Sequence, residues 1–145
     1  MSALPLFPAS VVGSLPRPRH VLDLIEKKHW NDADERAMDA AVRYAVSMQE
    51  AAGLDVVTDG EWRRRSYIGV IAELAHGFAL ETNIADGRPW TVVTEKLTPK
   101  PPGFIASEAK FLKSVARAAT KITLPAPALL GERLWHPVRS RGAYP

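Results

Sequence analysis

One long helical pattern followed by a short strand limits the folds open to this chain more than any other feature. Asp32 and Glu35 match a D-x-x-E capping pattern, and small and apolar residues then recur at helical spacing as far as Gly53, a typical helix stop. Leu54 to Val57 is a β-prone run that ends at Thr58-Asp59-Gly60. A short strand directly after a long amphipathic helix predicts a crossover unit in a parallel sheet.

Similar patterns recur on both sides of this unit. Apolar runs at residues 9–12 and 121–124 predict two more strands. Four further segments carry apolar residues at helical spacing: residues 20–28, 66–75, 106–119 and 128–135. Between them, Gly, Pro and Thr predict a loop-rich excursion over residues 78–104, with a hairpin of Phe78–Leu80 and Thr91–Thr94 around Asp86-Gly87. We therefore expect one α/β domain over residues 1–145, with about three βα units and no strong element after residue 141.

Composition excludes several classes of protein. The 19 Lys and Arg against 16 Asp and Glu give a net charge of +3 without a long basic tract, so nucleic acid is not an expected partner. No apolar run approaches the roughly 18 residues of a membrane span, and the first residues lack a basic leader, which predicts a cytoplasmic protein without a membrane partner. The absence of cysteine excludes disulfides and thiolate metal ligands within the chain.

Isolated histidines, tryptophans and arginines give weaker signals. The four histidines have no metal-ligand spacing and are expected at surfaces or helix caps, while the four tryptophans are expected to pack in the core or at its rim. The run Arg63-Arg64-Arg65 is expected to be solvated surface, although it could meet phosphate or carboxylate groups.

Three unusual loops follow the predicted strands: Gly13–Pro18, Asp59–Glu61 and Pro125–Pro127. In a parallel α/β sheet these loops share the face where ligands bind. Gly13 allows close approach to the backbone, and Ser14 offers a hydroxyl and an N–H for a carboxylate or phosphate; a plain turn is the alternative. One acidic side chain of the second loop could hold an ammonium group, and the alternative is a turn aspartate beside a solvated glutamate.

The segments VVGSLPRP, QEAAGLDVVTDGEWRR and KITLPAPALLGERLW, in this order, resemble the opening of the catalytic barrel of cobalamin-independent methionine synthases and their shorter relatives. The resemblance implies the N-terminal portion of a (β/α)8 TIM-type barrel, which needs roughly 250 residues when complete. It also implies transfer of a methyl group from a folate-type or other donor to the thiol of homocysteine. In this family a zinc ion activates that thiol by lowering its pKa.

The resemblance also implies roles for individual residues. Val12, Gly13, Ser14 and Glu61 would contact the amino-acid part of homocysteine, with Ser14 holding the carboxylate and Glu61 the ammonium group. Asp59 would support the loop, and Arg63 could reach an anionic donor. It assigns no catalytic residue and no metal ligand within these 145 residues.

The chain departs from the family pattern in two places. Pro125-Ala126-Pro127 replaces a Thr-Gly-Pro turn without the following folate-stacking tryptophan, which puts a folate donor in doubt. The family's zinc ligands, a His-x-Cys pair with a later Glu and Cys, lie on downstream strands. We therefore expect the 145 residues alone neither to bind catalytic zinc nor to transfer methyl groups.

The sequence leaves two other functions open. One is a coenzyme M-type thiol alkyltransferase. The other is a noncatalytic partial-barrel module that assembles as a homo-oligomer or with a complementing chain, since unpaired strand edges invite association.

Overall fold

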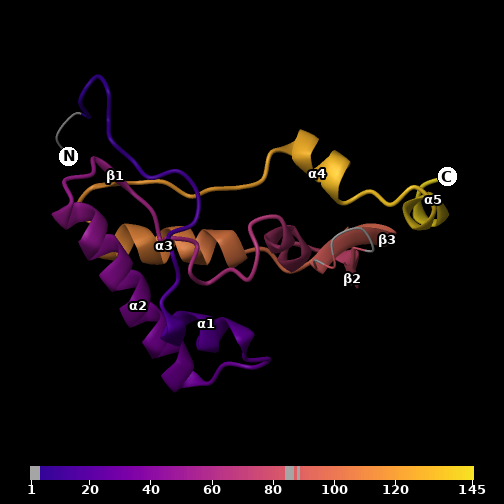
Figure 1. The fold of residues 1–145 in the computed structure, drawn as a ribbon, viewed down its shortest axis with the longest axis horizontal. Coiled ribbons are helices and arrows are strands. Elements are labelled where there is room, and N and C mark those ends of the chain that lie inside the picture. Colours follow the sequence, from indigo (N-terminus) through magenta and orange to yellow (C-terminus); the bar gives the residue numbers. More distant parts are fainter. Residues whose placement is uncertain (1–3, 84–86, 88) are drawn as a thin grey trace. The chain divides into compact units, whose positions relative to one another are not determined.

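The computed structural model describes residues 4–83, 87 and 89–145. The chain divides into two compact units, whose helices and strands are labelled in Figure 1. The first unit comprises the residues up to 65 together with 105–123, and the second comprises residues 66–104 and 124–145. The expectation of a single domain stays a prediction.

Three helices and two short strands form the first unit: α1 (Arg19–Glu26), α2 (Asp32–Ala51), β1 (Val56–Val57), α3 (Phe104–Val115, from residue 105 on) and β4 (Ala119–Thr120). One hydrophobic core joins the three helices to the segment after β1. Its most buried members include Val21 of α1, Met38 and Val42 of α2, Trp62, and Leu112 of α3. The packing roles expected for tryptophan are therefore confirmed at Trp62.

The start of α2 was predicted correctly, but its cap was not. The N-cap is Asn31, whose side chain accepts hydrogen bonds from the backbone N–H groups of Ala33 and Asp34, and Asp34 accepts one from the Asn31 N–H in return. The predicted pairing of Asp32 with Glu35 is wrong because Asn31, one residue earlier, already provides a capping box with Asp34.

Asp34 makes the stability of this helix end depend on pH. The hydrogen bond from Lys27 Nζ at 2.6 Å, and then the Asn31 N–H, hold the pKa of Asp34 below its usual value. A carboxyl group with a lowered pKa in the folded state adds stability above its unfolded pKa, and this stability is lost as the pH falls through the folded value.

We expect Asp34→Asn to reduce the free energy of unfolding at pH 7 and to flatten its decline below pH ~4, the unfolded pKa of an aspartate. Urea unfolding at pH 7 and pH 3 measures both effects. Asp32→Asn removes the same charge from the same turn and is the matched control. Equal pH dependence in the two variants would contradict this account.

The predicted parallel arrangement of strands is confirmed. β1 and β4 pair in parallel, with Val56 opposite Ala119 and Val57 opposite Thr120. Together with the helices, these strands make an α/β fold, as the pattern predicted.

The two flanking strands are shorter than predicted. Of residues 9–12, Ser10 alone makes a parallel bridge, to Val56. β4 lies two residues before the predicted 121–124 because α3 ends at Val115 rather than at Ala119. Only Lys121 extends the pairing, through its N–H to the Val57 carbonyl.

The second unit contains a 3-10 helix η1 (Gly69–Glu73), a hairpin of β2 (Ala75–Thr82) and β3 (Pro89–Pro99), and two short helices, α4 (Pro127–Arg133) and α5 (Arg139–Ala143). The predicted pairing within the hairpin is confirmed: Phe78, Ala79 and Leu80 lie opposite Val93, Val92 and Thr91. The strands extend further than predicted. Asp86 of the expected turn lies outside the described residues.

The helix predicted over residues 66–75 is wrong. Only the 3-10 helix η1 forms there, and the chain enters β2 at Ala75. Gly69 and the β-branched Val70 and Ile71 weaken an α-helix at this point. The pairing also shifts within the hairpin: His76 lies opposite Thr98 but Phe78 lies opposite Val93, so Gly77 faces the four residues 94–97 of β3.

α5 was not predicted because its sequence carries little apolar periodicity. A buried hydroxyl joins it to the hairpin instead: Ser140 Oγ donates to the Val93 carbonyl at 2.6 Å. His136 has the capping role expected of a histidine, because its Nδ1 accepts from the N–H groups of Val138 and Arg139. Among the described residues, no helix is long and apolar enough to cross a membrane.

Candidate functional site

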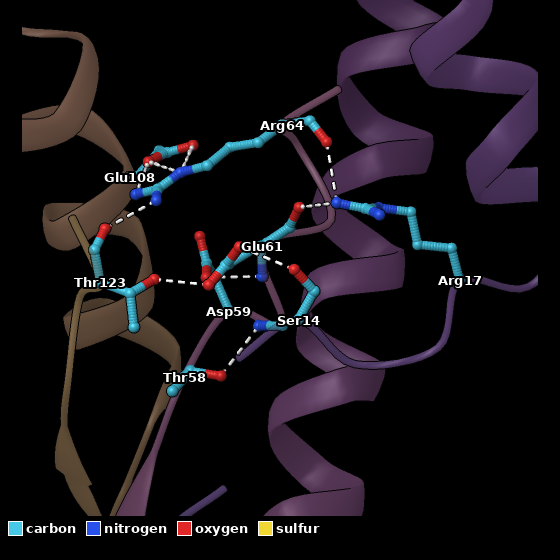
Figure 2. A network of polar contacts seen from close by, with 9 residues as sticks. Ser14, Arg17, Thr58, Asp59, Glu61, Arg64, Glu108 and Thr123 are labelled. Carbon is cyan, nitrogen blue, oxygen red and sulfur yellow. Dashed lines mark hydrogen bonds and ion pairs between the residues drawn. The ribbon is translucent and has the colours of Figure 1, made fainter. Parts of the chain in front are cut away.

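Ser14 and Glu61, two residues predicted to share a site, are in direct contact. Ser14 Oγ donates a hydrogen bond to Glu61 Oε2 at 2.7 Å, and Thr123 Oγ1 donates to Glu61 Oε1 at 2.6 Å (Figure 2). Glu61 is only 2% exposed. Each oxygen of this buried carboxylate therefore accepts from a neutral hydroxyl, and the two hydroxyls come from distant parts of the sequence.

The backbone of Glu61 is strained and held in place from both sides. Its φ of 58° is the only positive value at a non-glycine residue in the described part of the chain. Asp59 Oδ1 accepts from the Glu61 N–H at 2.9 Å, and Arg17 Nη2 donates to the Glu61 carbonyl at 2.9 Å. Such a conformation costs about 1–3 kcal/mol and persists where the surroundings over-determine it, often at functional sites.

Gly60 joins the two loops that carry Ser14 and Glu61. Its carbonyl accepts from the Leu15 N–H at 3.1 Å, and its own N–H donates to Thr58 Oγ1. A Cβ at this position would lie 3.1 Å from the Trp62 ring and 3.2 Å from Leu15, at a φ of 70°. Glycine therefore permits both the turn and the close packing of the loops.

A buried ion pair lies beside the carboxylate site (Figure 2). Arg64 Nη2 is 2.8 Å from Glu108 Oε2, and both side chains are 1% exposed. Burial raises the pKa of Glu108, and the guanidinium of Arg64 opposes that shift. Arg64 Nη1 also donates to the Thr123 carbonyl at 2.7 Å. The pair thus connects α3 to the residue whose hydroxyl contacts Glu61.

The other residues predicted for the site differ in exposure. Val12 is 96% exposed, and Gly13, with a φ of 77°, has open space around its Cβ position, so the loop before Ser14 presents a free surface. Asp59 is buried and supports the Glu61 N–H, while its Oδ2 is buried without a partner. Arg63 turns instead to Asp39 of α2.

Solvated surface is the wrong description for Arg63 and Arg64, whereas Arg65 is exposed as predicted. Arg64 is 2% exposed and paired with Glu108, and Arg63 bonds to Asp39 and lies over the Phe111 ring at 5.0 Å. Arg65 donates to the Ile25 carbonyl. All three guanidinium groups therefore bind partners within the first unit.

Four residues of this network were not predicted: Arg17, Arg64, Glu108 and Thr123. Arg17, Arg64 and Thr123 lie inside the three segments singled out from the sequence, so their places in those motifs were the available signal. Glu108 had none, because its partner is 44 positions away and helix periodicity does not indicate pairing across that distance.

The zinc ion implied by the resemblance does not fit the residues present. The chain has no cysteine, and the described residues contain no group of three or more His, Cys, Asp or Glu side chains arranged to hold a metal. The chemistry of the site therefore rests on carboxylate, hydroxyl and guanidinium groups.

Two proteins of known function are similar in sequence to this chain. A methionine synthase of Sulfurisphaera tokodaii is 34% identical over 145 residues, covering 91% of this chain and 41% of that protein. A 5-methyltetrahydropteroyltriglutamate–homocysteine methyltransferase of Aeromonas salmonicida is 34% identical over 83 residues, covering 53% of this chain and 11% of that protein. The chain thus spans about two-fifths or less of the length of these relatives.

A solved structure and a family model point to the same kind of protein as these relatives. The structure of a B12-independent methionine synthase from Shewanella sp. W3-18-1, in complex with selenomethionine, has a TM-score of 0.70 and 25% identity, covering 92% of this chain and 42% of that one. The model of the cobalamin-independent synthase catalytic domain matches residues 7–121, most of the chain. The chain belongs to the cobalamin-independent synthase family, and its matched residues fall within the catalytic domain.

Proposed function

We propose that this chain is the first part of the barrel of a methionine synthase, and that Ser14 and Glu61 bind the amino-acid part of homocysteine. The observation that carries the proposal is the contact of Ser14 Oγ with the buried Glu61 carboxylate at 2.7 Å. The Shewanella relative binds selenomethionine, and methionine, selenomethionine and homocysteine all have the same α-amino acid group. The relatives' names favour this function over a coenzyme M-type alkyltransferase.

Glu61 suits an ammonium group. An ionised carboxylate has about four acceptor positions, and the hydroxyls of Ser14 and Thr123 use two of them. The remaining positions can accept N–H donors from a ligand. Burial lowers the local dielectric constant and strengthens such a charge-assisted bond.

Ser14 suits the ligand's carboxylate. Its hydroxyl has a single proton, which it now donates to Glu61. We propose that an arriving ammonium replaces this hydroxyl at Glu61 Oε2, so that Ser14 turns to the ligand carboxylate. The exposed Val12-Gly13 segment, with a glycine at φ 77°, leaves room for this movement and for close approach of the ligand to the backbone.

The complete reaction would transfer a methyl group to the homocysteine thiol. The name of the Aeromonas relative favours a folate-type donor. Since the relatives are more than twice as long, we propose that the residues that activate the thiol lie outside these 145, in the rest of a (β/α)8 barrel, a complementing chain or a second copy. We further propose that the protein acts in the cytoplasm, on small molecules.

Titration of the purified chain with L-methionine tests the binding proposal. We expect Glu61→Gln to weaken binding about tenfold or more, because a hydrogen bond to a charged group contributes about 1.5–3 kcal/mol. Isothermal titration calorimetry gives the affinity, and amide chemical shifts of Ser14 and Glu61 locate the ligand.

Two controls make this test specific. Glu26→Gln removes the same charge from an exposed position of α1 and should leave the affinity unchanged. N-acetyl-L-methionine lacks the ammonium group. Its affinity for the unsubstituted chain should be no higher than the affinity of L-methionine for Glu61→Gln. The assignment of Glu61 to the ammonium group would be refuted if the unsubstituted chain bound both ligands equally well. It would also be refuted if Glu61→Gln left the affinity for L-methionine unchanged.

A further inference from the structure

We propose that Thr123 is a positioning residue of this site: its hydroxyl fixes the orientation of the Glu61 carboxylate, and the buried Arg64–Glu108 pair fixes Thr123. The inference rests on the proposed binding of an α-amino acid. It divides the two hydroxyls around Glu61 into a fixed one, on Thr123, and a movable one, on Ser14.

Thr123 is held at two points. Its Oγ1 donates to Glu61 Oε1 at 2.6 Å, and its carbonyl accepts from Arg64 Nη1 at 2.7 Å (Figure 2). Threonine is β-branched, so its χ1 angle has few favourable values. With the backbone fixed by Arg64, the direction of the hydroxyl is therefore largely set before a ligand arrives.

Arg64 is itself a firm anchor. Its Nε and Nη2 both donate to Glu108, at 3.1 and 2.8 Å, and both side chains are 1% exposed. Moving Arg64 away from Glu108 would leave an unpaired buried charge, which is strongly unfavourable. Arg17 adds a second constraint, because its Nη2 donates to the carbonyls of both Glu61 and Arg64 at 2.9 Å.

Ser14 contrasts with Thr123 in each of these respects. It is exposed and follows Gly13, whose Cβ position is open. Its hydroxyl can therefore leave Glu61 Oε2 at little cost, whereas the Thr123 hydroxyl stays on Oε1. The ligand's ammonium is thus directed to the Oε2 side of the carboxylate, and the loss of Thr123 would free the carboxylate to rotate away.

The test compares Thr123→Val, which removes the hydroxyl at nearly constant shape, with Thr123→Ser, which keeps it. We expect L-methionine to bind about tenfold more weakly to the valine variant and within about twofold of the original affinity to the serine variant, given the worth of a hydrogen bond to a charged group. Thr120→Val, at an exposed position of β4, should leave the affinity unchanged.

A second measurement needs no ligand. In the ¹³C spectrum at constant pH, the side-chain carboxyl resonance of Glu61, assigned by its loss in Glu61→Gln, should shift in Thr123→Val and return in Thr123→Ser. A general loss of structure would move resonances throughout the first unit instead. If the valine variant does not fold, Thr123→Ala replaces it in both measurements.

The outcomes separate this inference from the proposed function. If Glu61→Gln weakens binding but Thr123→Val does not, the positioning role is overturned and the amino-acid site stands. If the unsubstituted chain does not bind L-methionine, the proposed function fails, and an unchanged Glu61 carboxyl resonance in Thr123→Val would then overturn the positioning role as well. A shift that serine restores supports it.

Discussion

Glu108→Ala is expected to lower the free energy of unfolding by about 3–5 kcal/mol, the usual cost of removing one partner from a buried ion pair. The substitution leaves the Arg64 guanidinium without its carboxylate in a position where the side chain is 1% exposed. Arg64 also holds the Thr123 carbonyl, so the loss extends to the residues around Glu61. Urea unfolding followed by circular dichroism measures the change.

Two comparison variants separate charge pairing from the removal of a side chain. Glu26→Ala, at an exposed position, should change stability by no more than about 0.5 kcal/mol. The double variant Arg64→Met with Glu108→Leu removes both charges and should regain much of the lost stability, since apolar replacements of buried pairs are often tolerated. A double variant as unstable as Glu108→Ala would show that the ion pair is not the cause.

Gly77→Ala is expected to disrupt the hairpin of the second unit. Gly77 has a φ of 99°, which alone costs a side-chain-bearing residue about 1–3 kcal/mol. A Cβ there would also lie 2.9 Å from the carbonyl oxygens of Glu95 and Lys96, which are backbone atoms of the paired strand and cannot turn aside. The strand pairing must therefore shift to accept it.

Amide hydrogen exchange in β2 and β3 should rise sharply in Gly77→Ala. Gly87→Ala is the matched control, because Gly87 also has a positive φ, 70°, but no described residue beyond its chain neighbours lies within 4 Å of its Cβ position. Gly87→Ala should lower stability only by the backbone strain and leave amide hydrogen exchange in β2 and β3 nearly unchanged. Similar exchange in the two variants would mean that the contact with Glu95 and Lys96 is not decisive.

Elements with strong local patterns were predictable from the sequence. The apolar spacing of α2 and the stop at Gly53 predicted a long helix and a following strand, and both form. The hairpin pairing of Phe78–Leu80 followed from turn residues between two β-prone runs. In each case the deciding interactions lie within one segment or between neighbouring segments.

Features set by distant partners were not predictable. Arg64 was expected in solvent, but Glu108, 44 positions later, pairs with it inside the unit. Periodicity over residues 66–75 predicted a helix, but from Ala75 onward the chain forms β2, which pairs with β3. The contact of Ser14 with Glu61 was predictable from the rule that strand-end loops share a face and from the family resemblance. Thr123 was missed because its segment reads as a plain strand.

The spacing of the three side chains around the Glu61 carboxylate has a consequence for biosynthesis. Ser14 and Glu61 are 47 positions apart, and Glu61 and Thr123 are 62 positions apart. Since a protein emerges from the ribosome starting at its N-terminus, a nascent chain that ends before residue 123 cannot complete this arrangement, however well α1 and α2 have already folded.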